Sequence, residues 1–278
     1  MTEAAEFAAE PQRRGRRPGP ERRGPRPGSR RDRVRAATKD EIIKTARRLL
    51  VEEGPDTLSL RAIAREMGMT APGLYRYFAS HEELVRNVVA EIFTEMAADI
   101  HNALASVRDE HAPGVSEEEA HKDTRHITLE MVAACREFRR WSLRHPAEFS
   151  LVFGVPLPGV DDGRYDIASA CALQFAGVYF TLFLKLWHAH PFPVQAPSEI
   201  DPGLRDQLER YITSIGADIP VGTMLIFLRC WVLLYGAVSM EMFGHLGFAL
   251  DDPSPMFDIM LSDLAALVGL RYPLPEDS

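Results

Sequence analysis

Residues 57–83 contain two short stretches of helical periodicity that are separated by a single glycine. Ser59 is placed to cap the first helix, whose apolar positions fall on one face, and Gly68 favours a left-handed stop. Thr70 is placed to cap a second helix, which we expect to extend to Phe78. Two helices joined by such a tight turn predict a helix-turn-helix, a motif whose second helix enters the major groove of DNA.

The outward positions of the second helix are small residues followed by phenols and a guanidinium. Small residues let the backbone approach DNA closely, and hydroxyl, phenol and guanidinium groups bind phosphates. An ordinary helical hairpin with two surface tyrosines is the alternative interpretation. The predicted DNA contacts, including arginines upstream of the motif, are Arg30, Arg31, Arg33, Ser59, Arg61, Thr70, Ala71, Pro72, Gly73, Tyr75, Arg76 and Tyr77.

The flanks of the motif predict one helix before it and a longer helix after it. Thr38 to Glu41 and Ser80 to Glu83 each have the pattern of a capping box. With these flanks, residues 38 to about 96 resemble the DNA-binding domain of the TetR family of transcriptional regulators. The resemblance is carried by Ala46, Gly54, Ile63, Ala64, Gly68, the stretch Thr70 to Phe78, and Glu82 to Leu84.

This resemblance implies a homodimeric regulator that reads a palindromic operator, because each monomer has a single recognition helix. It implies a small-molecule effector that binds among the C-terminal helices and, as our main expectation, a repressor that this effector releases from DNA. An activator or a co-repressor response is the alternative, because the sequence does not separate them. The family usually has a lysine at the start of the fourth helix, and this chain has His81, which can donate one hydrogen bond to a phosphate but lacks the fixed charge. We expect His81 to complete the DNA contacts.

Charge is divided unevenly along the chain. The net charge is −8, yet residues 1–80 hold 18 Lys and Arg against 11 Asp and Glu, a balance of +7. Residues 81–278 hold 14 against 29, a balance of −15. A basic end on an acidic body suits a two-part DNA-binding protein, because the acidic part is repelled by the duplex and orients the basic part toward it.

Residues 11–35 contain eleven arginines and two acids among prolines and glycines. This composition cannot bury enough apolar surface to fold, so residues 1–36 are expected to be a disordered arm. The arm has two interpretations: a minor-groove hook, with Arg14 to Pro18 and Arg23 to Pro27 as its arginine-proline segments, or a nonspecific polybasic leader. A DNA-compacting protein driven by this arm is the alternative function from another class.

The remaining sequence predicts an all-α chain with a DNA-binding domain at 37–97 and an effector-binding and dimerisation domain at 98–278. Two apolar stretches also raise the possibility of a membrane span, since Ile167 to Leu184 contains no charge over 18 residues. We interpret them instead as buried helices, one in the core and one at a subunit interface. The expected helices of this domain are 116–144, a short one around Phe149, 165–188, 203–215, 222–243 and 254–269.

A narrower resemblance covers about 120 residues of the C-terminal part. Phe138 to Val155, followed by Trp231, Tyr235 and Gly236, resembles the WHG ligand-binding domain of some TetR-type regulators, with Tyr235 at the position of the histidine. Bulky, polarizable side chains suit an apolar effector. The predicted pocket residues are Trp141, Phe149, Gln174, Phe175, Tyr179, Met224, Phe227 and Trp231.

No pattern in the sequence supports catalysis, a cofactor or a metal site. His188 and His190 lie in a proline-rich segment without the nearby cysteine or paired acids that a metal site would need. The sequence also contains no nucleophile elbow of the Gly-x-Ser-x-Gly type. The three cysteines are scattered, as expected in a reducing cytosol. The first ten residues lack the basic leader and apolar core of a signal peptide, which favours a cytoplasmic protein.

Overall fold

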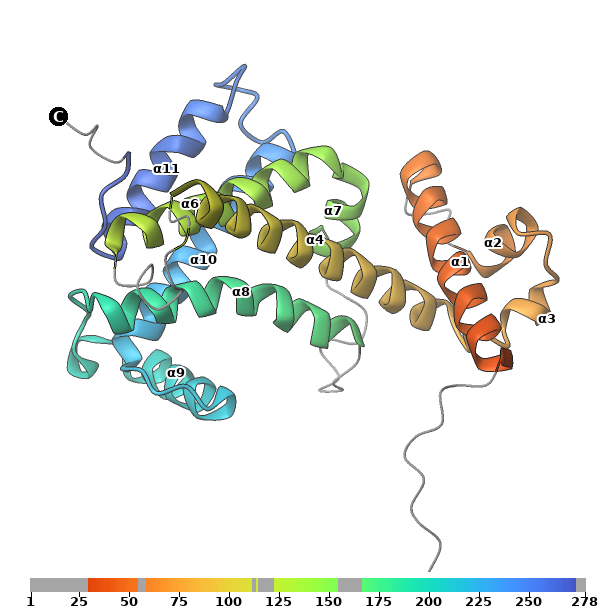
Figure 1. Ribbon diagram of the computed structural model, residues 1–278, viewed down its shortest axis with the longest axis horizontal. Coiled ribbons are helices and arrows are strands. Elements are labelled where there is room, and N and C mark those ends of the chain that lie inside the picture. Colours follow the sequence, from red (N-terminus) through yellow and green to blue (C-terminus); the bar gives the residue numbers. More distant parts are fainter. Residues whose placement is uncertain (1–29, 55–58, 112–113, 115–122, 155–166, 274–278) are drawn as a thin grey trace, which may run out of the picture. The chain divides into compact units, whose positions relative to one another are not determined.

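The computed structural model describes residues 30–54, 59–111, 114, 123–154 and 167–273 (Figure 1). All regular structure in these residues is helical, which confirms the all-α fold. The helices are α1 (Arg30–Glu53), α2 (Leu60–Glu66), α3 (Ala71–Leu74), α4 (His81–His111), α6 (Thr124–Arg144), α7 (Pro146–Phe153), α8 (Ile167–Ala189), α9 (Pro202–Ile215), α10 (Val221–Met242) and α11 (Ser254–Leu267), with a 3-10 turn at Pro197–Glu199.

Helix α1 begins at Arg30, before the start expected from the capping box at Thr38. The Thr38 hydroxyl instead donates a hydrogen bond to the carbonyl of Val34 inside the helix, at 3.0 Å. Residues 30–36 contain neither proline nor glycine, and extending a helix costs less than starting one. The predictions of a helix start at Thr38 and of a disordered arm reaching residue 36 are therefore wrong. Residues 1–29 lie outside the described residues.

The helix-turn-helix is built from local capping interactions. The Ser59 side chain accepts the N–H of Ala62 at 3.1 Å, and the Thr70 side chain accepts the N–H of Gly73 at 3.2 Å. Gly68 has φ +64°, and the next N–H, that of Met69, reaches back to the Ala64 carbonyl at 2.8 Å, which closes α2. The two predicted caps and the glycine stop are confirmed.

Helix α3 is shorter than expected. It ends at Leu74, and the following residues form a tighter turn in which the Tyr77 N–H bonds to the Leu74 carbonyl three residues earlier. Leu74 and Phe78 are nonetheless both fully buried, as predicted, together with Ile42 and Ile63. The recognition segment is thus one α-helical turn followed by a second, tighter turn fixed to the core.

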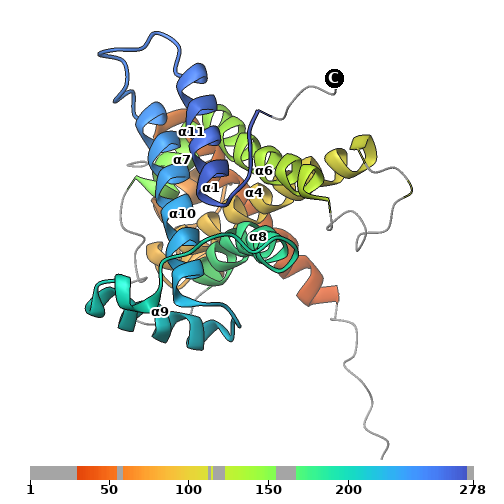
Figure 2. The ribbon, with the colours of Figure 1, turned by 90° about the vertical axis from the view of Figure 1, so that its left-hand side faces the viewer.

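The C-terminal helices pack around α4. Helices α6 and α8 both lie along α4 and touch each other, and α10 packs against α11, α9 and α6 (Figures 1 and 2). Helix α6 is capped by Asp123 and ends at Arg144, before the predicted stop at His145 and Pro146. The expected start of this helix at Ser116 falls outside the described residues.

Two helices, over Ala170–Ala189 and Val221–Met242, are long and apolar enough to cross a membrane by length and composition alone. Core helices of soluble domains meet the same criteria. In α8, Phe175, Leu182 and Leu186 are buried against neighbouring helices, and in α10 the same holds for Leu234 and Val238. Packing inside a helical domain therefore accounts for part of their apolar composition.

Candidate DNA-binding surface and effector cavity

The two capping hydroxyls are available for a second interaction. Ser59 and Thr70 each accept one backbone N–H at the start of a helix, and both residues are exposed. A hydroxyl group that accepts a hydrogen bond still has its own hydrogen to donate. Both hydroxyls, which belong to predicted DNA-contact residues, are therefore held in a fixed orientation and keep one hydrogen to donate.

The first residues of α3 have small side chains, so they leave its backbone accessible. Pro72 is exposed, whereas Ala71 and Gly73 are half-buried. A Cβ atom added at Gly73 would lie 3.1 Å from the Thr70 hydroxyl oxygen, closer than nine in ten real Cβ contacts. Glycine at this position therefore preserves the cap and also lets another backbone come near.

The two tyrosines of the recognition segment differ in their surroundings. Tyr75 is 52% exposed, whereas Tyr77 is half-buried and packs against the hydrophobic core. Of the two predicted contacts, Tyr75 is therefore the more accessible. Arg61, Arg76 and His81 are exposed, and so are Arg30, Arg31 and Arg33 at the start of α1.

A cavity of about 70 Å³ lies among α6, α8, α10 and α11. Three of the eight predicted pocket residues line it: Tyr179, Phe227 and Trp231. The sequence did not single out the other walls, which come from α6 and α11. These walls include Thr128, Met131, Cys135, Leu261 and Leu264.

The other five predicted pocket residues lie outside this cavity. Trp141 is fully buried, and its indole N–H points to Glu95 at 3.3 Å. Phe149 and Phe175 are buried in an aromatic cluster around Phe138. Met224 packs in a separate apolar cluster beside α9, and Gln174 is exposed to solvent. Periodicity identified these side chains as apolar or inward but could not assign them to one cavity.

The cavity wall carries no charge. Burial raises the pKa of the Cys135 thiol to about 12 and that of Cys230 to about 11, so both are protonated near neutral pH. Burial also raises the pKa of Tyr179 well above its ordinary value, and its hydroxyl donates to the Ala134 carbonyl at 3.1 Å. The site therefore suits an uncharged ligand, because a buried ion would find no partner there.

Comparison with known families identifies both parts of this arrangement. Residues 42–88 match the family described as bacterial regulatory proteins, tetR family. Residues 131–264 match the tetracyclin repressor-like C-terminal domain. The chain belongs to the TetR family. It is therefore a DNA-binding helix-turn-helix transcriptional regulator, and the family is not one of enzymes.

TetR-family relatives extend the likeness over most of the chain. The HTH-type transcriptional regulators Rv1816 of Mycobacterium tuberculosis and Mb1846 of Mycobacterium bovis are each 28% identical over 233 residues, which is 82% of this chain and 91% of theirs. The crystal structure of the regulatory protein SCO4313 has a TM-score of 0.59 at 25% identity, over 86% of this chain and 100% of that chain. A TetR-family regulator from Streptomyces coelicolor shares the fold, with a TM-score of 0.52 at 13% identity, over 84% and 80% of the two chains.

Proposed function

We propose that this TetR-family regulator is a cytoplasmic repressor that binds a palindromic operator as a homodimer and is released by an uncharged, apolar effector. The observation that carries the proposal is the charge-free cavity lined by α6, α8, α10 and α11. We assign DNA reading to residues 37–97, and effector binding and dimerisation to residues 98–278. Release would follow if the effector favours a spacing of the two reading heads that misfits the operator.

The size of the cavity supports a link between effector binding and helix movement. An engineered cavity of about 150 Å³ holds benzene in another protein, roughly twice the space available here. An effector as large as benzene would therefore displace some of the side chains or helices that line the cavity. Since two of those helices, α6 and α8, lie along α4, such a displacement is not confined to the cavity.

Support for a homodimer comes from exposed apolar side chains on the last two helices. Exposed apolar side chains on two helices that pack together are what a subunit interface would cover. They are Val232, Leu233 and Met240 on α10, with Met256 and Ile259 on α11.

We also propose that the C-terminal domain is of the WHG type. Tyr235, at the position of the signature histidine, donates its hydroxyl hydrogen bond to the Phe153 carbonyl at 3.0 Å. It thereby joins α10 to the end of α7. This structural bond gives the position a role that does not need an imidazole.

Genome-wide footprinting of the purified protein, followed by a thermal-shift screen, tests the proposed function. We expect footprints of fixed length centred on a palindrome, and stabilisation by neutral apolar compounds but not by their carboxylate or ammonium analogues. Coating that grows in proportion to DNA length would favour an architectural protein driven by the arginine-rich arm. Stabilisation by charged compounds alone would contradict the proposed effector class.

A further inference from the structure

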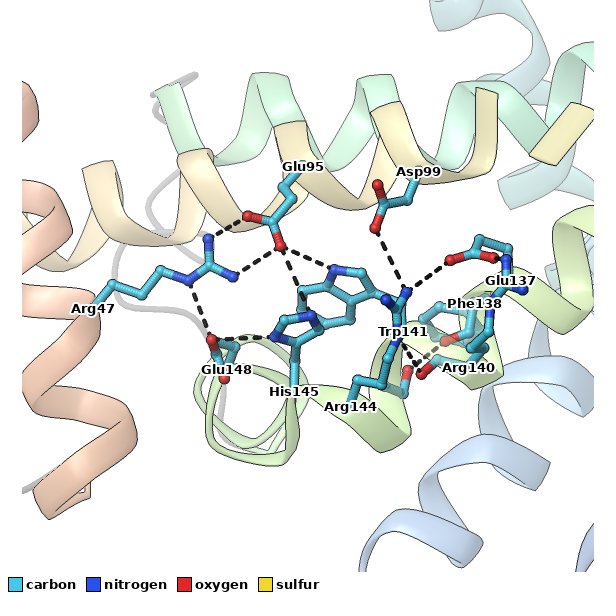
Figure 3. A network of polar contacts seen from close by, with 11 residues as sticks. Arg47, Glu95, Asp99, Glu137, Phe138, Arg140, Trp141, Arg144, His145 and Glu148 are labelled. Atoms are coloured by element: carbon cyan, nitrogen blue, oxygen red, sulfur yellow. Dashed lines mark hydrogen bonds and ion pairs between the residues drawn. The ribbon is translucent and has the colours of Figure 1, made fainter. Parts of the chain in front are cut away.

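Arg47 connects the DNA-binding helices to two other helices through ion pairs. From α1, its Nη2 atom donates to Glu95 Oε1 on α4 at 2.9 Å, and Nη1 donates to the second oxygen of the same carboxylate. Its Nε atom donates to Glu148 Oε1 on α7 at 3.2 Å (Figure 3). The Arg47 side chain is 15% exposed and that of Glu148 is 5% exposed. All three nitrogen atoms of the guanidinium are thus used in one partly buried cluster, in which the Glu95 side chain is 36% exposed.

The end of α6 holds the same two carboxylates from the opposite side. Trp141 donates its indole N–H to Glu95 Oε1 at 3.3 Å. His145 Nδ1 lies 3.5 Å from Glu148 Oε1, and the imidazole stacks on the Trp141 ring with centroids 4.7 Å apart. Figure 3 shows the indole and imidazole between Arg47 and the rest of α6. Four helices therefore meet at two carboxylate groups.

The neighbouring arginine shows what an ordinary ion pair of this region looks like. Arg48 pairs with Glu52 and Glu66, both within the DNA-binding helices, and all three side chains are about half exposed. Exposed pairs of this kind contribute little stability. A bidentate, partly buried pair has a strict geometry, because any shift of one helix breaks a hydrogen bond that water does not easily replace.

Helix α6 joins this cluster to the cavity. Its Thr128, Met131 and Cys135 line the cavity, and Trp141 lies further along the same helix. An α-helix is stiff over this length, so a displacement at the cavity is carried to its end. The indole and imidazole would then move against the carboxylates that hold Arg47.

We propose that Arg47, Glu95 and Glu148 form an ion-pair latch that positions the reading helices, and that the α6–α7 corner sets operator affinity through it. The inference rests on the proposed repressor function. Arg47 is a positioning residue here: it acts through the placement of α1, on which α2 and α3 pack, and not by touching DNA. The latch is a non-covalent connection to the effector domain in addition to the covalent one through α4.

Three variants of the full-length dimer test the latch. Arg47→Met removes it, Glu148→Gln removes one charge with little change of shape, and Arg48→Met is the matched control on the same helix. We expect both latch variants to bind the footprinted operator about fivefold more weakly or worse, with random-duplex affinity within about twofold of wild type. Arg48→Met should leave the ratio of operator to random-duplex affinity unchanged.

The outcomes separate the latch from the proposed function. If Glu148→Gln keeps the wild-type affinity ratio, the latch is overturned while the repressor function stands. If the wild type has no defined footprint, the proposed function fails, and hydrogen exchange of the protein alone then decides the latch. Glu148→Gln should speed amide exchange in residues 42–53 relative to Arg48→Met, and equal exchange would overturn the inference. Glu148→Gln also serves if Arg47→Met does not fold.

Discussion

Replacing Val232 by glutamate should separate the dimer without unfolding the protomer. Val232 is 66% exposed on α10, so a carboxylate there remains hydrated in an isolated protomer. In a dimer formed by α10 and α11, each two-fold copy would bury this side chain. Losing the burial of two valines costs about 3 kcal/mol or more, before the cost of covering two carboxylates is added. Since about 1.4 kcal/mol is tenfold, the dissociation constant of the dimer should rise more than a hundredfold.

Sedimentation analysis at micromolar concentration, with far-UV circular dichroism as the check on folding, measures this effect. The matched control is Tyr211→Glu, which places the same charge on a 42% exposed side chain of another helix, α9. We expect Val232→Glu to be a helical monomer that fails to footprint a palindrome, and Tyr211→Glu to remain a dimer. A Val232→Glu variant that sediments as an undisturbed dimer would refute the assignment of this surface.

Three further predictions concern DNA binding and the latch. Tyr77→Phe should weaken binding to operator and random DNA alike by about 1 kcal/mol in a filter-binding assay; a loss confined to the operator would mean that Tyr77 reads a base. The hydrogen bond from Arg47 lowers the pKa of the Glu95 carboxyl group. The stability that this ionised carboxylate contributes to the folded protein is therefore fully present above the ordinary glutamate pKa of about 4.5, and it is lost as the pH falls through the lowered pKa of the folded state. Thermal melts of Glu95→Gln should therefore depend less on pH than wild type below pH 4.5. Deleting residues 1–29 should flatten the slope of log affinity against log salt concentration by several units, at about 0.9 per phosphate contact. If the arm is a minor-groove hook, the loss of affinity should be larger when the operator has A·T-rich flanks. An unchanged slope would show that the arm takes no part in DNA binding.

The DNA-binding motif could be predicted from sequence because its determinants are local. Ser59, Gly68 and Thr70 act on residues within five positions, and such interactions leave a readable pattern. The start of α1 was missed for a related reason. The capping pattern at Thr38 is a valid local signal, but a helix already formed upstream passes through it and uses the hydroxyl differently.

The cavity and the latch could not be predicted in the same way, because their parts are far apart in the chain. Periodicity shows that Trp141 and Trp231 face inward, yet only the packing of helices separates a side chain at the latch from one in the cavity. Arg47 and Glu148 are 101 residues apart. In the sequence, Arg47 and Glu148 are each one charged residue of a helix, and no local pattern indicates that they form an ion pair.

The reactivity of the two cysteines that line the cavity, Cys135 and Cys230, can be used to follow movements of α6 and α10. Alkylating reagents such as iodoacetamide react with thiolate, and burial raises the pKa of Cys135 to about 12, so little thiolate is present at pH 7. Labelling of Cys135 and Cys230 should therefore be slow, and faster when a movement of α6 and α10 lets more water reach the thiols. The labelling rate, followed by mass spectrometry, would time this opening without any introduced probe, and an effector that fills the cavity would protect both thiols at once.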